Sequence, residues 1–237
     1  MLKFKDYEYK RPDFVALEKE FKELLEKFDR AESFEEQNQI MATINKLRSN
    51  VETMSNLAFI RHSINTQDEF YSKEKDFFDE NMPLYEKIVT EFYKSLVNSK
   101  FRAELEKAWG KQIFTLAELK LKTFSEEIME DLVKENKLIT QYDKLIASAE
   151  IEFEGEKRNL SQMMPFIQSK DRKTRKAAYE AYTSFFVENE AEFDRIYDEL
   201  VKVRTEMARK LGYENFVELG STTHIRSFSS ASRHFKS

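Results

Sequence analysis

Histidines and acidic residues are the side chains of this chain that could do chemistry, because cysteine is absent. The histidines are His62, His224 and His234, and none has a neighbouring glutamate or a second histidine four residues away. A hydrolytic zinc site needs two histidines one helical turn apart, with a glutamate that activates a metal-bound water molecule. This sequence lacks that arrangement, so we expect no catalytic residue, no metal ligand and no cofactor in this chain.

The remaining polar candidates have simpler interpretations than catalysis. A lone histidine on a helix, such as His62, is more often structural than a metal ligand. The acids at residues 126–127 and 188–192 could act as general acids or bases, but solvated helix faces explain them without catalysis. The basic cluster at residues 170–176 could bind phosphate. We favour the start of a hydrated helix there, because the chain carries a net charge of -5.

A run of aromatic residues over residues 179–197 could line a groove for peptides. Its spacing is that of a buried helical face, so we favour core packing as the interpretation. The six residues are Tyr179, Tyr182, Phe185, Phe186, Phe193 and Tyr197.

Long helices must position these side chains, since residues that break helices are scarce. The 237 residues include 4 glycines and 3 prolines, whereas the two types together make up about 12% of ordinary proteins. Hydrophobic residues form 41% of the chain, which is enough for a substantial core. The net charge of -5 argues against a nucleic-acid partner. No apolar run has the length of a signal peptide or of a membrane span, so we expect a cytoplasmic chain without a membrane partner.

Apolar residues at three- and four-residue steps predict helices over most of the chain. Ser33 with Glu36 predicts the N-terminal cap of the second helix, and Thr66 with Glu69 predicts the cap of the third. Pro83 is predicted to kink or restart this third helix. We expect the first three helices to form an antiparallel bundle.

Further along, glycines and one change of period mark the element boundaries. Gly110 is predicted to end a short helix, and Ser125 to cap a long one. Near residues 150–161 apolar and acidic residues alternate, and Gly155 supplies a turn, which predicts a β-hairpin whose second strand covers residues 158–160.

Two more helices are predicted after Pro165, at residues 171–187 and 190–211. Gly212 suits the left-handed conformation that ends the second of them. The predicted fold class is therefore all-α, a multi-helix antiparallel bundle with one small β-hairpin near residues 150–161.

Three segments, taken in order, carry a recognisable pattern over residues 9–220. They are Tyr9-Lys10-Arg11-Pro12-Asp13-Phe14, residues 151–160 with 171–177, and the arginine-containing helix at residues 201–211 with its turn Leu211-Gly212-Tyr213. Together they resemble the oligoendopeptidase F family of zinc metallopeptidases, relatives of thimet oligopeptidase. The resemblance covers the N-terminal helical part, less than half of a complete member.

The resemblance implies a parent enzyme that cleaves internal bonds of short peptides with zinc held on a His-Glu-x-x-His helix. In such an enzyme the helical part forms a wall of the deep channel that admits oligopeptides. Zinc is expected in the complete family member only, and this chain is predicted to be inactive alone, with a catalytic half as a possible partner. The alternative is a stand-alone helical module that binds peptides or a protein partner.

The residues after Gly220 differ from the rest of the chain. Residues 221–237 contain no acid, three basic residues and six serines. We expect residues 1–220 to be the N-terminal helical part of an oligoendopeptidase-like protein. The Ser-rich basic tail is interpreted as out-of-frame translation, with a functional disordered tail as the alternative. If the helices normally pack on a catalytic half, a large apolar patch should be exposed.

Overall fold

The computed structural model describes residues 3–223, leaving residues 1–2 and 224–237 outside the description. Most of the expected tail, including His224 and His234, therefore lies outside the described residues, while residues 221–223 end the last helix. The described residues divide into two compact units, residues 3–133 with 204–223 and residues 134–203. Each unit has a buried apolar cluster of its own.

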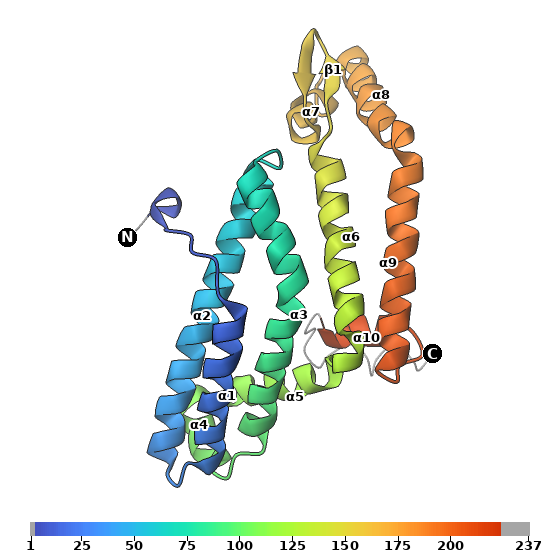
Figure 1. Ribbon diagram of the computed structural model, residues 1–237. Helices are drawn as coiled ribbons and strands as arrows, with labels where there is room; N and C mark the ends of the chain where they lie inside the picture. Colours follow the sequence, from blue (N-terminus) through green and yellow to red (C-terminus); the bar gives the residue numbers. More distant parts are fainter. Residues whose placement is uncertain (1–2, 224–237) are drawn as a thin grey trace. The chain divides into compact units, whose positions relative to one another are not determined.

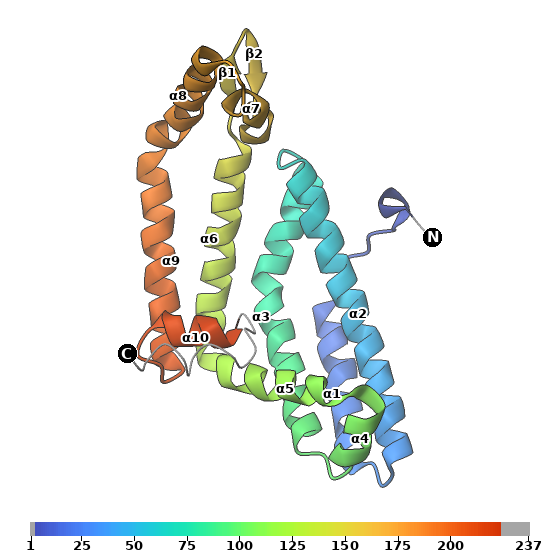
Figure 2. The ribbon, with the colours of Figure 1, turned by 180° about the vertical axis from the view of Figure 1, so that it is seen from behind.

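Three long helices form the body of the first unit, α1 (Phe14–Arg30), α2 (Phe34–Ile64) and α3 (Glu69–Val97). They are joined by short connections, pack on one another and lie side by side in both ribbon views (Figures 1 and 2). The predicted antiparallel bundle is thereby confirmed. The unit also contains α4 (Arg102–Trp109), α5 (Lys111–Thr123), α10 (Phe216–Thr223) and 3-10 turns at Phe4–Asp6 and Glu126–Ile128.

Phenylalanine rings build much of the core of this bundle. Phe21, Phe28 and Phe92 are fully buried, and the rings of Phe28 and Phe92 meet edge to face with centroids 6.2 Å apart. Removing such a ring from water contributes about 1.5–3 kcal/mol to folding. Several of the many phenylalanine side chains in the sequence therefore pack in the core of the bundle.

The start of α2 follows the sequence-based prediction with one difference. Ser33 is the N-cap, because its hydroxyl accepts a hydrogen bond from the backbone N–H of Glu36 at 3.3 Å. The carboxylate of Glu36 accepts a hydrogen bond in return, but from the backbone N–H of Glu32 at 2.9 Å. The reciprocal cap thus reaches one residue further back than predicted.

The start of α3 differs from the prediction, and the helix is not restarted at Pro83. The predicted cap at Thr66 is wrong, because the carboxylate of Asp68 accepts a hydrogen bond from the backbone N–H of Tyr71 at 3.0 Å and starts the helix at the following residue. The helix then continues through Pro83 without a restart. Pro83 is buried, and the burial of its ring offsets the backbone hydrogen bond that proline cannot make.

The second unit combines parts of two long helices with a small α/β cap. In both views the hairpin lies against α7 and α8 (Figures 1 and 2). Its elements are residues 134–147 of α6 (Met129–Ala147), β1 (Ile151–Phe153), β2 (Glu156–Arg158), α7 (Leu160–Ile167), α8 (Arg172–Glu188) and residues 190–203 of α9 (Glu190–Lys210). Its buried cluster contains Ala149, Ile151, Met163, Ala178 and Phe185.

The predicted hairpin is confirmed, and its turn accounts for the local sequence. The strands are antiparallel, and the two residues between them, Glu154 and Gly155, have φ angles of 51° and 79°. Positive φ at both positions is the two-residue turn whose twist matches that of the paired strands. The second strand covers residues 156–158 rather than the predicted 158–160, because this short turn starts the return strand at once.

Helix α7 is missing from the sequence-based prediction, in which the first helix after the hairpin begins at residue 171. Asn159 is its N-cap and accepts a hydrogen bond from the backbone N–H of Gln162, whose side chain accepts one from the N–H of Asn159, both at 2.9 Å. Such a reciprocal pair is a helix-start signal that can be read in a sequence. Pro165 lies inside the helix, so treating it as a boundary concealed this element.

Candidate functional site

A buried carboxylate fastens the segment before α1 to α3. Glu74 is 3% exposed and accepts hydrogen bonds from the hydroxyl of Tyr9 and from two nitrogens of the Arg11 guanidinium. The guanidinium carbon also lies 4.5 Å from the centre of the Phe77 ring. Because a guanidinium and a carboxylate match each other as planar partners, this pair fixes the course of the segment.

The charges of this cluster are fixed in the neutral range. The hydrogen bond from Arg11 holds the pKa of Glu74 below its ordinary value. Burial, and then the hydrogen bond to Glu74, raises the pKa of Tyr9. Glu74 therefore stays ionised and Tyr9 stays protonated near pH 7, so neither is suited to exchange a proton during a reaction. The cluster is an anchor for the segment.

A hollow of about 780 Å³ lies beside the same segment. Arg61 donates hydrogen bonds to the hydroxyl of Tyr71 at 2.7 Å and to the carbonyl oxygen of Tyr7 at 2.6 Å. Aromatic rings form much of the wall of this hollow, together with the charged side chains of Lys5, Glu8 and Arg61. It is lined by Phe4, Lys5, Tyr7, Glu8, Tyr9, Arg61, Ile64, Phe70 and Tyr71.

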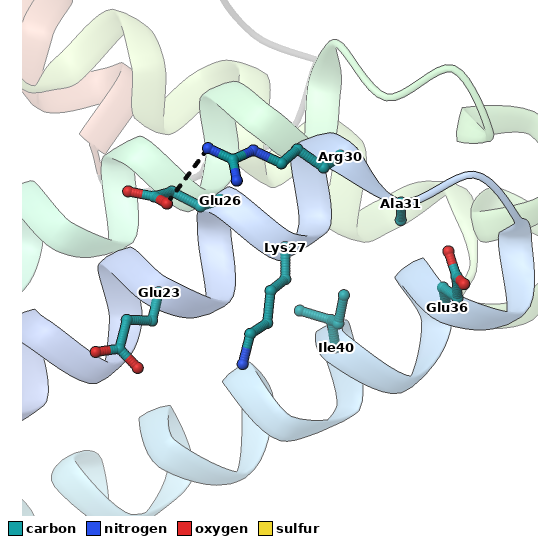
Figure 3. Close-up of a pocket in the computed structure, with 7 residues that line it drawn as sticks. All are labelled: Glu23, Glu26, Lys27, Arg30, Ala31, Glu36 and Ile40. Carbon is teal, nitrogen blue, oxygen red and sulfur yellow. Dashed lines mark ion pairs between the residues drawn. The ribbon is translucent and has the colours of Figure 1, made fainter.

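A second hollow, of about 540 Å³, lies between α1 and α2 (Figure 3). Charged side chains of both signs surround it, and Arg30 pairs with Glu26 at 3.7 Å. Both partners are largely exposed, so the pair stabilises the surface little. This mixture suits a hydrated surface and supplies no reactive group. The lining consists of Glu23, Glu26, Lys27, Arg30, Ala31, Glu36 and Ile40.

The acids and the histidine considered from the sequence take structural positions. His62 is buried in α2. Glu126 pairs with Lys87 at 3.0 Å, and Glu192 pairs with Arg195 at 2.7 Å. Glu126 belongs to the first unit and Glu192 to the second. Each of these two acids takes part in an ion pair at the surface.

The basic cluster at residues 170–176 surrounds a helix start that is already capped. Asp171 accepts a hydrogen bond from the backbone N–H of Thr174 at 2.7 Å, and this bond lowers the pKa of Asp171. A helix start is where a phosphate would bind, and here a carboxylate occupies that place. The hydrated helix start is the interpretation that this geometry supports.

Within residues 3–223, no three His, Cys, Asp or Glu side chains come together as ligands for a metal ion. The described residues therefore do not fit a zinc ion, and we derive no hydrolytic step from them. His224 and His234 lie outside this range. In the same range, every helix is too short or too polar to cross a membrane.

The aromatic run divides into a packed part and an exposed part. Tyr179 and Tyr197 are 60% and 72% exposed, so the core-packing prediction is wrong for these two. The buried face of α8 passes through Ala178 and Phe185, and the next residue after Ala178 is turned about 100° away from it. For the other four residues the prediction is confirmed. The packed residues are Tyr182, Phe185, Phe186 and Phe193.

The Leu-Gly-Tyr turn closes α9 as predicted. Gly212 has a φ of 84°, and the N–H groups of Gly212 and Tyr213 donate to the carbonyl oxygens of Arg209 at 3.0 Å and Ala208 at 2.8 Å. The hydroxyl of Tyr213 donates to the carbonyl oxygen of Lys122 at 3.2 Å. The segments that carry the family resemblance thus form an anchor, a hairpin and a helix end.

Comparison with known proteins agrees with that resemblance. Residues 4–124 match a family described as the peptidase M3 N-terminal domain. The comparison with curated proteins gives no match.

Solved structures match nearly the whole chain. An X-ray structure described as an oligoendopeptidase F is 53% identical, with a TM-score of 0.95 over 98% of this chain and 41% of its own. One from Bacillus anthracis str. Ames, described in the same way, is 54% identical, with a TM-score of 0.94 over 96% of this chain and 42% of its own. PZ peptidase A, solved with an inhibitor, is 51% identical, with a TM-score of 0.94 over 97% of this chain and 41% of its own. The chain thus spans well under half the length of these structures.

Proposed function

We propose, because the chain belongs to the M3 peptidase family, that it acts as the non-catalytic N-terminal part of a zinc-dependent oligoendopeptidase. Residues 4–124 are an M3 N-terminal domain, and the chain corresponds to the N-terminal part of an oligoendopeptidase F-type protein. One observation supports the proposal most: 98% of this chain aligns, at 53% identity, with only 41% of an oligoendopeptidase F.

In this proposal the parent protein cleaves internal bonds of short peptides, and residues outside this chain hold the zinc. The helices of this chain would form one wall of the channel that admits the peptide. Two features support such a role. The described residues do not fit a metal ion, and exposed aromatic side chains such as Tyr179 and Tyr197 are available for contacts with other polypeptide.

The alternative is a stand-alone helical module that binds peptides or a protein partner. The hollow beside Arg61 favours it, because Phe4, Tyr7, Ile64 and Phe70 are exposed around this hollow. Exposed aromatic side chains are common anchors in binding surfaces. Under the first proposal, the hollow beside Arg61 would contribute less to function than the contacts between this chain and the rest of the parent protein.

An assay of the purified chain with an internally quenched oligopeptide distinguishes these functions. We expect no cleavage with or without added zinc, and no saturable change in the anisotropy of a labelled oligopeptide. Saturable binding without cleavage would favour the stand-alone module. Cleavage that is abolished by a chelator and restored by zinc would contradict the non-catalytic role.

A further inference from the structure

Helix α9 carries more apolar surface than the described chain covers. Ile196 and Val203 are buried on one side of the helix. A second apolar row lies beside them, formed by Tyr197 and Val201, which are four residues apart and therefore on one face. These two side chains are 72% and 47% exposed. An apolar face wider than its packing partner indicates room for a second partner.

The same row is covered further along the helix. Ala208 lies about three helical turns after Tyr197, on the same face, and it is fully buried together with Leu219 of α10. The guanidinium of Arg204, between the two ends of the row, lies over the Phe216 ring at 5.3 Å. The exposed pair Tyr197 and Val201 therefore extends a row that already serves as a packing surface.

A charged residue beside the row, Asp198, is paired within the helix, because it lies 2.6 Å from Lys202. The pair formed by Arg195 and Glu199 lies on the opposite face of the helix, away from the row. The chemistry of the row therefore fits an apolar, uncharged face of another helix or strand, because an unpaired charge placed against it would lose its water without gaining a partner.

Resting on the function proposed above, we infer that Tyr197 and Val201 form a docking surface for the catalytic part of the parent peptidase. Relatives that are 51–54% identical to this chain contain more than half of their length outside the matched region. That additional polypeptide must bury apolar surface of its own, and an apolar row next to a packed interface is a suitable surface to receive it.

Protection of Tyr197 from hydroxyl-radical oxidation, measured by mass spectrometry, tests the docking surface. The chain would be compared alone, joined after Thr223 to the unmatched part of the Bacillus anthracis relative, and mixed with that part as a separate polypeptide. We expect oxidation of Tyr197 to slow several-fold in the joined or the mixed sample. Equal rates in all samples, with a joined protein that folds and cleaves peptides, would overturn the docking surface and leave the proposed function standing.

Substitutions give a second readout of the same surface. Val201→Ser should leave the Tm of the chain alone unchanged and lower the Tm of the joined protein. Val15→Ser, at an exposed valine on α1, is the matched control and should change neither. Equal changes in Tm for both variants would overturn the assignment. Protection of Tyr197 from oxidation that rises with the concentration of the chain alone would also overturn it, because a second copy would then be the partner. Protection that requires an added oligopeptide would identify a substrate contact and overturn it as well.

Discussion

The buried carboxylate of Glu74 on α3 accepts hydrogen bonds from the guanidinium of Arg11, 63 residues earlier in the chain. Arg11 belongs to one of the segments that resemble the oligoendopeptidase F family. Its partner shows what the segment does: it holds the start of the chain against the bundle. At this position the residues that carry the resemblance therefore have a structural role.

Removing the guanidinium should destabilise the first unit. Arg11→Ala leaves the buried carboxylate of Glu74 with the hydroxyl of Tyr9 as a partner, and an under-satisfied buried charge costs about 1–3 kcal/mol. Because half of the Arg11 side chain is exposed, we expect the lower part of that range. Urea unfolding measures the change. Lys73→Ala, which removes an exposed ion pair with Glu69 on the same helix, should cost less than about 0.5 kcal/mol; equal losses in the two variants would contradict the anchor.

The same contact should make stability depend on pH in acid. The pKa of Glu74 in the folded chain lies below its ordinary value of 4.5, so the unfolded chain takes up this proton first as the pH falls. The stabilisation is therefore present above pH 4.5 and is lost as the pH falls through the folded pKa. The free-energy difference between the natural chain and Glu74→Gln should shrink below that pH. A difference that stays constant from neutral pH into this acid range would count against the contact.

The divided aromatic run predicts different outcomes for two aromatic residues of α8. Phe185→Ala removes a buried ring from the second unit and should cost about 3–5 kcal/mol. Tyr179→Ala removes an exposed ring and should cost less than about 0.5 kcal/mol in the chain alone. Thermal unfolding followed by circular dichroism compares them. Similar losses would show that the two rings are packed alike.

Gly212 should tolerate side chains according to their backbone preferences. Its φ of 84° is unfavourable for other residues, and no atom lies within 4 Å of an added Cβ, so the cost comes from the backbone alone. Gly212→Ala should destabilise by about 1–2 kcal/mol, and Gly212→Asn by less, because asparagine adopts this conformation more readily. Chemical denaturation of both variants checks the order. Stabilisation by alanine would contradict the left-handed helix end.

Local signals in the sequence account for much of the fold. The hairpin could be located because the hydrophobic period changes and Gly155 follows at once, and the end of α9 because Gly212 follows the last apolar residues. The cap of α3 was misplaced because Thr66 and Asp68 are both good caps, and only the structure shows which carboxylate or hydroxyl meets a free N–H.

Contacts between distant residues could not be predicted in the same way. Nothing in the sequence around Arg11 identifies Glu74 as its partner, because the pairing depends on how the segment crosses the bundle. The exposure of Tyr197 was also missed. Its spacing fits the wide apolar face of α9, and periodicity alone cannot tell a covered half of such a face from an open half. Tyr179, Val187, Tyr197 and Val201 are exposed apolar side chains, and the expected large apolar patch stays a prediction.

Peptide cleavage by the chain after it is joined to the unmatched part of the Bacillus anthracis relative tests the proposed function most directly. We predict zinc-dependent cleavage of an internally quenched oligopeptide by the joined protein, and none by either part alone. A joined protein that folds, binds zinc and still fails to cleave, or cleavage by this chain without the added part, would contradict it.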